Sequence, residues 1–439
     1  MNKTVNVIGA GLAGCEAAYQ VAKRGIDVKL YEMKPQKRSP AHHSGNFAEL
    51  VCSNSLRSDQ VENAVGLLKE ELRTMDSLIL RAADATRVPA GGALAVDREG
   101  FSEYVTAAIK ETKNIQIVYE EQDSIPSDDI TIIATGPLTS EPMFNCIEKI
   151  IGEDYLHFFD AAAPILTFDS INMDKAFKAA RYGKGTEDYI NCPMDREEYE
   201  VFYNALINAE LAEVKNFEKN MVFEGCMPIE SMAQRGKDTI RFGPLKPVGL
   251  TDARTNNKSY AVVQLRQDNK NGTLFNIVGF QTHLKWPEQK RVFSLIPGLE
   301  NAEFVRYGVM HRNTYINSPK LLDNTYRVIK NDSLYFAGQI TGVEGYIEST
   351  ASGFVAGINA AAKCLNKESV VFPANTAVGA LSSYISDASV KNFQPMNANF
   401  GLFSNIDTSI RDKKKRNSEI AQNSLKIVNQ IFESIKKWS

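Results

Sequence analysis

The stretch VNVIGAGLAG, residues 5–14, decides the fold of this chain. It joins a short apolar run to three glycines at the spacing GxGxxG, and a small-residue helix pattern follows to about residue 24. A second apolar run, residues 27–32, ends on Glu32. A strand, a glycine turn, a helix and a second strand that ends on an acid make up the unit that binds the pyrophosphate of a dinucleotide. The sequence therefore predicts an α/β, Rossmann-like fold that begins at the first strand.

Each glycine of this unit has its own task. Gly9 permits the tight turn, Gly11 lets the backbone approach a pyrophosphate, and Gly14 lets the helix pack closely on the strand. The pyrophosphate then meets unpaired N–H groups and about half a positive charge at the helix N-terminus. The carboxylate of Glu32 is expected to accept hydrogen bonds from ribose hydroxyls, which favours an unphosphorylated ribose. The cofactor contacts predicted here are Gly9, Ala10, Gly11, Leu12, Ala13, Gly14 and Glu32.

FAD, NAD and S-adenosylmethionine all fit such a unit, and two distant stretches favour FAD. Residues 132–136 form an apolar strand that ends in Ala-Thr-Gly, an ending often seen where a chain passes an FAD. Residues 338–346, GQITGVEGY, follow a strand and open a helix whose start can face the ribityl chain and the phosphates. One GxGxxG is present, so no separate nicotinamide domain is visible. These stretches add Thr135, Gly136, Gly338, Gln339, Gly345 and Tyr346 to the predicted cofactor contacts.

The pattern along the chain also predicts its domains. The 439 residues are enough for two or three domains of about 100–200 residues each. After about residue 155 the chain mixes short alternating runs with polar loops, and dinucleotide-type signals resume at residue 333. We predict a discontinuous FAD-binding domain, residues 1–155 and 326–439, and an inserted α+β domain, residues 156–325, that faces the substrate or RNA. Long helices are expected at residues 62–83 and 417–437.

Composition excludes several classes of protein. No run of 18 apolar residues predicts a membrane helix, and the N-terminus leads straight into a strand, so a cytoplasmic protein is expected. The net charge of −3 gives no overall signal for nucleic acid, and an RNA partner would need a local basic patch. Six scattered cysteines form no CxxC pair, which argues against a structural zinc site, and no bound metal is expected.

Four further stretches are long and specific. They are residues 48–57 (AELVCSNSLR), 89–98 (PAGGALAVDR), 223–230 (FEGCMPIE) and 308–314 (GVMHRNT). Together with residues 63–71 and 338–353, they closely resemble the folate- and FAD-dependent tRNA (uracil-5-)-methyltransferases, the TrmFO family, which is related to the GidA (MnmG) flavoproteins. The resemblance runs from the first strand to the C-terminal helix.

The resemblance implies a reaction. An enzyme of this family takes a methylene group from 5,10-methylenetetrahydrofolate and places it on C5 of a uridine in the T-loop of tRNA, which forms 5-methyluridine. Reduced FAD converts the methylene group to a methyl group, and NAD(P)H reduces the flavin again. The expected partners are therefore a transiently bound tRNA and a folate, with no obligate protein partner evident.

The resemblance also gives two thiols a role. C5 of uracil is not nucleophilic until a group adds at C6, and a cysteine thiolate is suited to that addition. A base must then remove the C5 proton. The resemblance implies that Cys226 attacks C6 and that Cys52, in a loop beside the flavin, is the general base. We expect cations near Cys226 to favour its thiolate.

The remaining residues have weaker assignments. The resemblance implies flavin contacts for the loop residues Ser53, Asn54 and Ser55. His311 and Arg312 are candidates for the folate glutamate tail or an RNA phosphate. Candidates for the cations near Cys226 are Arg235, Lys237 and Arg241, and candidates for RNA contacts are Lys285, Trp286, Lys290 and Arg291. Cys192 is expected to be structural, and Cys15, Cys146 and Cys364 are expected in the core.

Several alternatives stay open at this point. A GidA (MnmG) enzyme, which modifies the wobble uridine, carries a longer C-terminal helical region than this chain offers. The same chemistry on a ribosomal RNA uridine depends on surface shape, which the sequence does not reveal. A catalytically silent FAD-containing RNA-binding protein is a third alternative, and an S-adenosylmethionine-dependent methyltransferase is a fourth.

Overall fold

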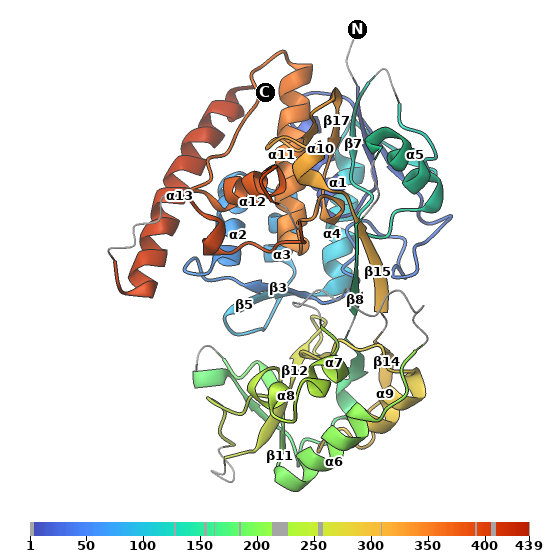
Figure 1. The fold of residues 1–439 in the computed structure, drawn as a ribbon, viewed down its shortest axis with the longest axis vertical. Helices are drawn as coiled ribbons and strands as arrows, with labels where there is room; N and C mark the ends of the chain where they lie inside the picture. Colours follow the sequence, from blue (N-terminus) through green and yellow to red (C-terminus); the bar gives the residue numbers. More distant parts are fainter. Residues whose placement is uncertain are drawn as a thin grey trace.

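The computed structural model describes residues 4–126, 129–152, 156–161, 163–183, 186–212, 227–252, 258–308, 310–390, 393–404 and 410–438. Its elements form two lobes, and Figure 1 shows the upper lobe, which holds both ends of the chain, above a lower lobe drawn in green and yellow. In the part of the chain that is described, no helix is both long and apolar enough to cross a membrane.

The upper lobe is built on a six-stranded sheet. Its order is β16-β17-β7-β1-β2-β6, and every pair is parallel except the edge pair of β16 with β17. The strands are β1 (Val5–Ile8), β2 (Val28–Glu32), β6 (Ile115–Tyr119), β7 (Ile130–Ile133), β16 (Arg327–Val328) and β17 (Asn331–Phe336). Both β1 and β7 are buried along their whole length, as parallel strands with helices on both faces must be. The predicted Rossmann-like α/β fold is confirmed.

Two helices from opposite ends of the chain pack against each other in the middle of this lobe. They are α1 (Leu12–Ala22), drawn in blue, and α11 (Tyr346–Cys364), drawn in orange (Figure 1). A Cβ added at Gly353 would overlap the backbone of Ala13, and one at Gly357 would lie 2.8 Å from Cα of Ala17. The two glycines of α11 therefore let the helices approach to backbone contact.

The remaining helices cover the sheet and its flank. They are α2 (Ala64–Thr74), α3 (Leu78–Ala85), α4 (Arg98–Glu111), α5 (Glu141–Ile151), α10 (Ser318–Leu321), α12 (Ala377–Ile385) and α13 (Lys413–Ile435). The single helix predicted for residues 62–83 is wrong, because the chain turns between α2 and α3. Asp76 takes a left-handed conformation, with φ of 58°, and Ser77 caps α3 by accepting a hydrogen bond from the Leu80 N–H. The helix predicted for residues 417–437 is confirmed as α13, with ends shifted by a few residues.

A buried carboxylate joins three of these helices. Glu71 of α2 is fully buried and accepts hydrogen bonds from the backbone N–H groups of Ala377 and Val378, at 2.7 and 2.8 Å, and from the hydroxyl of Ser424. The two N–H groups open α12, and Ser424 lies on α13. Burial raises the pKa of Glu71 to about 7, although all three hydrogen bonds act in the opposite direction.

The lower lobe holds an antiparallel sheet and its own hydrophobic cluster. The order of this sheet is β10-β11-β12-β13-β9-β14. Its strands are β9 (Ile165–Thr167), β10 (Phe177–Ala179), β11 (Tyr189–Met194), β12 (Ala261–Gln267), β13 (Leu274–Ile277) and β14 (Phe304–Arg306). The helices α6 (Arg196–Ile207), α7 (Ile229–Gln234), α8 (Thr239–Phe242) and α9 (Trp286–Phe293) lie in the same lobe (Figure 1).

Two small sheets lie beside or between the lobes. The antiparallel pair of β8 (Leu156–Ala161) and β15 (Met310–Tyr315) runs from the upper lobe toward the lower one (Figure 1). The sheet of β3 (Ser55–Ser58), β5 (Ala93–Val96) and β4 (Arg87–Val88) lies at the bottom of the upper lobe. Tyr315 and Leu322 fall within the segment predicted as the inserted domain, but they belong to the hydrophobic cluster of the upper lobe. The exact domain boundaries, 1–155 with 326–439 and 156–325, stay a prediction.

Candidate functional site

The glycine turn after β1 forms a cradle. Gly9 has φ of 101°, and a Cβ there would lie 2.6 Å from the carbonyl oxygen of Ala134. A Cβ at Gly14 would overlap the carbonyl oxygen of Gly9, whereas the Cβ position at Gly11 is open. That opening faces a cavity at the N-terminus of α1, so an anionic group can approach the backbone there. The tasks expected of the three glycines therefore fit the geometry.

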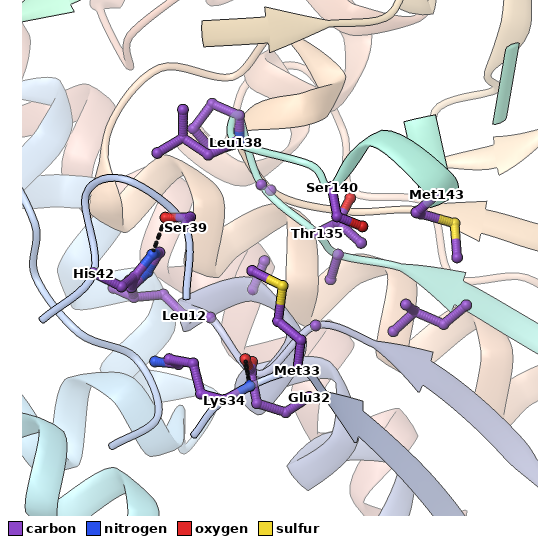
Figure 2. A pocket seen from close by; sticks show the side chains of 18 of the residues that line it. Leu12, Glu32, Met33, Lys34, Ser39, His42, Thr135, Leu138, Ser140 and Met143 are labelled. Carbon is purple, nitrogen blue, oxygen red and sulfur yellow. Dashed lines mark hydrogen bonds between the residues drawn. The ribbon is translucent and has the colours of Figure 1, made fainter. Parts of the chain in front are cut away.

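This cavity, called here the glycine cavity, has a volume of about 170 Å³. Figure 2 shows Glu32, Met33 and Lys34 on one side of it, and Thr135, Leu138 and Ser140 on another. The predicted contacts that line it are Gly9, Gly11, Leu12, Ala13, Glu32, Thr135, Gly136, Gly338, Gln339 and Tyr346. Ala10 and Gly14, which were also predicted as contacts, are not among the residues that line it.

Glu32 is held by the backbone around it. Its Oε2 accepts a hydrogen bond from the Ala10 N–H at 2.9 Å, and its Oε1 accepts one from the Lys34 N–H at 2.9 Å. Glu32 is 7% exposed, and these hydrogen bonds fix its carboxylate at the end of β2, where the residue borders the glycine cavity. Each oxygen keeps a second lone pair, which leaves capacity for a ligand hydroxyl.

The second glycine segment meets the first. Gly338 and Gly345 have φ of 85° and 123°, values that favour glycine, and the Gly338 N–H donates to the Ser352 hydroxyl at 2.7 Å. Gly345 caps α11. The start of α11 is thus brought beside the start of α1, which is how two stretches more than 300 residues apart border one cavity.

The loop that carries Cys52 is attached to the same helix. The N–H groups of Cys52 and Ser53 donate to the phenol oxygen of Tyr346, at 2.8 and 3.3 Å. Burial raises the pKa of Tyr346, and the nearby Cys52 adds to that increase, so the phenol stays neutral. A second cavity of about 330 Å³ opens here and is called the thiol cavity. Tyr346 and Gln339 line both cavities, which therefore adjoin.

Three arginines surround this loop, and the sequence alone did not identify them. Arg266 of β12 donates to the Ser53 hydroxyl at 2.8 Å and to Oδ1 of Asn54 at 3.2 Å. Arg98 forms an ion pair with Asp268, 3.0 Å apart, and donates to the carbonyl oxygen of Leu50. The third is Arg306 of β14.

A negative charge at Cys52 would act to raise the pKa of all three guanidinium groups. Burial lowers the pKa of Arg266 and of Arg306, and a negative charge at Cys52 acts against that decrease. Burial also acts to lower the pKa of Arg98, but Asp268, with a contribution from Cys52, raises it overall. The three cations therefore favour a negative charge where the Cys52 sulfur lies. Arg98 lies in the PAGGALAVDR stretch, whereas no local pattern marks Arg266 or Arg306.

The other predicted site residues are placed as follows. Ser53 and Ser55 line the thiol cavity together with Cys52 and Gly345. Asn54 lines neither cavity, because its amide donates to the carbonyl oxygens of Val96 and Gln267. The Asn54 side chain thus joins the two lobes, and the cofactor contact predicted for this residue stays a prediction. Cys226 lies outside the described residues. His311 and Arg312 lie on β15, and the structure describes only their backbone.

Two of the cations expected to help Cys226 form ion pairs with carboxylates. Lys237 pairs with Glu200 at 2.6 Å, and Arg241 pairs with Asp238 at 2.8 Å. Arg235 follows α7 directly. The cysteines expected in the core are buried or pack against it. Burial raises the pKa of the Cys15 thiol and raises that of Cys192 to about 12, so both are inert.

The fold and this double cavity define a dinucleotide-binding protein of the flavoprotein type, with a thiol beside the dinucleotide site. Comparisons agree. The family model described as glucose inhibited division protein A (GIDA) matches residues 4–368. The methylenetetrahydrofolate--tRNA-(uracil-5-)-methyltransferase TrmFO of Acetivibrio thermocellus is 68% identical over 435 residues, which cover 99% of each chain. The TrmFO of Desulforamulus reducens is 61% identical over 432 residues, 98% of each chain.

A solved structure agrees on the fold. GidA of Aquifex aeolicus, in its form II crystal, matches with a TM-score of 0.72 and 17% identity, covering 100% of this chain and 75% of that one. At that identity the likeness concerns the fold alone. The chain belongs to the GidA family and, within it, to the TrmFO proteins. The resemblance seen in the sequence is confirmed.

Proposed function

We propose that this protein is a folate- and FAD-dependent methyltransferase that forms 5-methyluridine in the T-loop of tRNA. One observation carries the proposal: the Cys52 loop borders both the glycine cavity and the thiol cavity, is held by the Tyr346 phenol and lies near three guanidinium groups. A thiol placed in this way can exchange a proton with a ring that lies against a flavin. The family supplies the identity of the ring.

The glycine cavity fits FAD. The open position at Gly11, the start of α1 and the fixed carboxylate of Glu32 suit a pyrophosphate and an unphosphorylated ribose. Thr135, Gly136, Gly338, Gln339 and the backbone around Gly345 continue this surface toward the thiol cavity. Bound FAD would supply the electron pair that turns the transferred methylene group into a methyl group, and NAD(P)H is the proposed source of its electrons.

Two thiols divide the work on the uracil. Cys226 attacks C6, which makes C5 nucleophilic toward the one-carbon unit of 5,10-methylenetetrahydrofolate. Cys52 accepts the proton from C5, and the surrounding cations favour its charged form before it does so. Loss of that proton lets the tetrahydrofolate nitrogen leave the one-carbon unit, and once this unit is reduced to a methyl group the Cys226 sulfur leaves C6 and restores the C5–C6 double bond. Tyr346 holds the Cys52 backbone in place through two hydrogen bonds.

An aromatic stack on the lower lobe is the proposed RNA contact. Trp286 is 60% exposed, and its ring stacks on Tyr307 at 5.6 Å, which in turn stacks on Phe304 at 5.4 Å. Such a supported ring offers a base a stacking energy of about 1–3 kcal/mol. Lys285 and Arg291 beside it form exposed ion pairs with carboxylates, each worth about 0–1 kcal/mol. An RNA phosphate can take the place of the carboxylate in such a pair.

Other assignments complete the proposal. Lys290 is exposed on the same helix as Trp286 and adds a cation. His311 and Arg312 are proposed to contact the folate tail or an RNA phosphate. The inserted segment, residues 156–325, is the part that faces the RNA, and the reaction takes place in the cytoplasm, where tRNA is found.

Labelled substrate tests the proposal. The purified protein, reduced with NADPH, is mixed with tRNA or ribosomal RNA and methylene-labelled tetrahydrofolate, and the nucleosides are analysed by mass. We expect labelled 5-methyluridine from tRNA. Label in ribosomal RNA alone would move the proposal to that substrate, and a colourless protein that takes up no FAD would refute it.

A trapping experiment tests the thiol roles. RNA that contains 5-fluorouridine should form a covalent complex with the wild type and with Cys52→Ala, but not with Cys226→Ala. The reverse pattern would make Cys52 the attacking thiol.

A further inference from the structure

Two buried polar atoms, each on a residue that lines the thiol cavity, have no hydrogen-bond partner in the described part of the chain. They are Oε2 of Glu348 and Nδ2 of Asn276, and both residues line this cavity. A buried polar atom without a partner costs about 1–3 kcal/mol. One acceptor and one donor without partners, on residues that line the same cavity from different lobes, point to a ligand that supplies the missing partners.

The orientation of Glu348 is fixed. It is the third residue of α11 and is fully buried. Its Oε1 accepts hydrogen bonds from Nη1 of Arg57 at 3.1 Å and from the Ala398 N–H at 3.0 Å. A Cβ added at Gly345 would overlap Oε2, so a glycine is required for this oxygen to lie where it does.

The orientation of Asn276 is also fixed. It lies on β13 of the lower lobe, is 2% exposed, and has its amide beside Nη2 of Arg266 at 3.5 Å. A guanidinium group only donates, so the amide oxygen must face Arg266. The amide nitrogen is thereby left without a partner. Arg266 also donates to the Ser53 hydroxyl, which connects Asn276 to the loop that carries Cys52.

We propose that Glu348 and Asn276 together hold the edge of a pyrimidinone ring. Oε2 of Glu348 accepts the ring N–H, and Nδ2 of Asn276 donates to the neighbouring ring carbonyl. The inference rests on the proposed function, because the flavin, the pterin of the folate and the target uracil all present an N–H next to a carbonyl. The pair acts by positioning this ring beside Cys52 and takes no part in bond making.

Two substitutions exchange the hydrogen-bond acceptor of Glu348 for a donor, or the donor of Asn276 for an acceptor, without changing the size of the side chain. In Glu348→Gln, the amide oxygen keeps the contacts with Arg57 and Ala398, so an N–H donor replaces Oε2. In Asn276→Asp, the oxygen facing Arg266 is kept, and an acceptor replaces Nδ2. Each change turns one attraction to the ring into a repulsion.

Three binding measurements identify the ring. FAD affinity is measured first from flavin absorbance on dilution. Tetrahydrofolate titration and tRNA mobility shifts then follow, with FAD at saturation. We expect both variants to weaken binding of the same one of these three ligands by about 10- to 100-fold. The methylated form of that ligand, which lacks the ring N–H, should bind the wild type as weakly as the natural ligand binds Glu348→Gln.

A surface variant and the melting temperature serve as controls. Glu70→Gln makes the same chemical change on α2 and should leave all three affinities unchanged. If no affinity changes in Glu348→Gln and Asn276→Asp, the open atoms hold only water, and the inference is wrong. It is also wrong if all three affinities fall together with the melting temperature. Absence of 5-methyluridine from the wild type would refute the proposed function instead, and the three affinities remain measurable in that case.

Discussion

Glu71 makes the stability of the upper lobe depend on pH near neutrality. Burial raises its pKa from an ordinary 4.5 to about 7, so the folded protein prefers the protonated carboxyl. The stabilisation is therefore complete below pH 4.5 and is lost as the pH rises through 7. Each unit of the pKa shift changes the free energy of unfolding by about 1.4 kcal/mol, so the whole shift of Glu71 is worth about 3 kcal/mol. About 2.5 kcal/mol of this change falls between pH 5 and 8.

The measurement compares the wild type with Glu71→Gln, which is neutral at every pH. Thermal unfolding is followed at pH 5, 6, 7 and 8. Glu71→Gln should be less stable than the wild type at pH 5, and the difference should shrink by about 2.5 kcal/mol by pH 8. For 439 residues unfolding as a unit, at an entropy of about 2.1 cal/mol/K per residue, this amounts to about 3 °C.

The control is the neighbouring Glu70, whose side chain is 39% exposed and pairs with Arg73. Glu70→Gln should follow the wild type at all four pH values. A difference between wild type and Glu71→Gln that stays constant, or grows, from pH 5 to 8 would show that burial does not control this carboxyl. The explanation of the three-helix junction would then be wrong.

Three further outcomes are expected. Gly353→Ala should lower both melting temperature and FAD affinity, because the new Cβ overlaps the Ala13 backbone and overpacking costs about 1–3 kcal/mol; an unchanged affinity would show that the helix contact does not shape the cavity. Asp268→Asn leaves the Arg98 charge uncompensated and should lower the free energy of unfolding, measured by thermal unfolding, by about 3–5 kcal/mol. A decrease below about 1 kcal/mol would mean that water already screens this ion pair. Trp286→Ala should weaken tRNA binding about 5- to 100-fold in mobility shifts, because the stacking contact is lost. The control is Lys175→Ala, which breaks an exposed ion pair with Glu300 and should leave tRNA binding unchanged. Equal effects of the two substitutions would show that Trp286 does not stack on a base.

The parts of the fold that local chemistry determines were predictable. The glycines at 9, 11 and 14 act within one turn of chain, so their spacing, together with the strand and helix patterns around them and Glu32, predicted the cradle and the strands beside it. The break between α2 and α3 was not predicted, because the apolar periodicity continues across it. The left-handed Asp76 and the Ser77 cap outweigh that periodicity.

Contacts between distant residues left no signal in the sequence. Arg266 and Asn54 are 212 positions apart, and Arg98 and Asp268 are 170 apart, so neither pair forms a local pattern. The sequence placed Asn54 near the flavin because it stands in the Cys52 loop. Only the fold shows that its amide is used by backbone carbonyls of both lobes.

The contact of α1 with α11 also has a consequence for biosynthesis. Roughly 200 residues separate β7 from α11, and a ribosome needs about 10–40 s to add them. During that interval the first strands and the glycine turn have emerged but lack the helix that completes them, while the lower lobe already has its own core. Cofactor capture is therefore a late event, and a nascent chain that stalls before residue 353 should be unable to retain FAD.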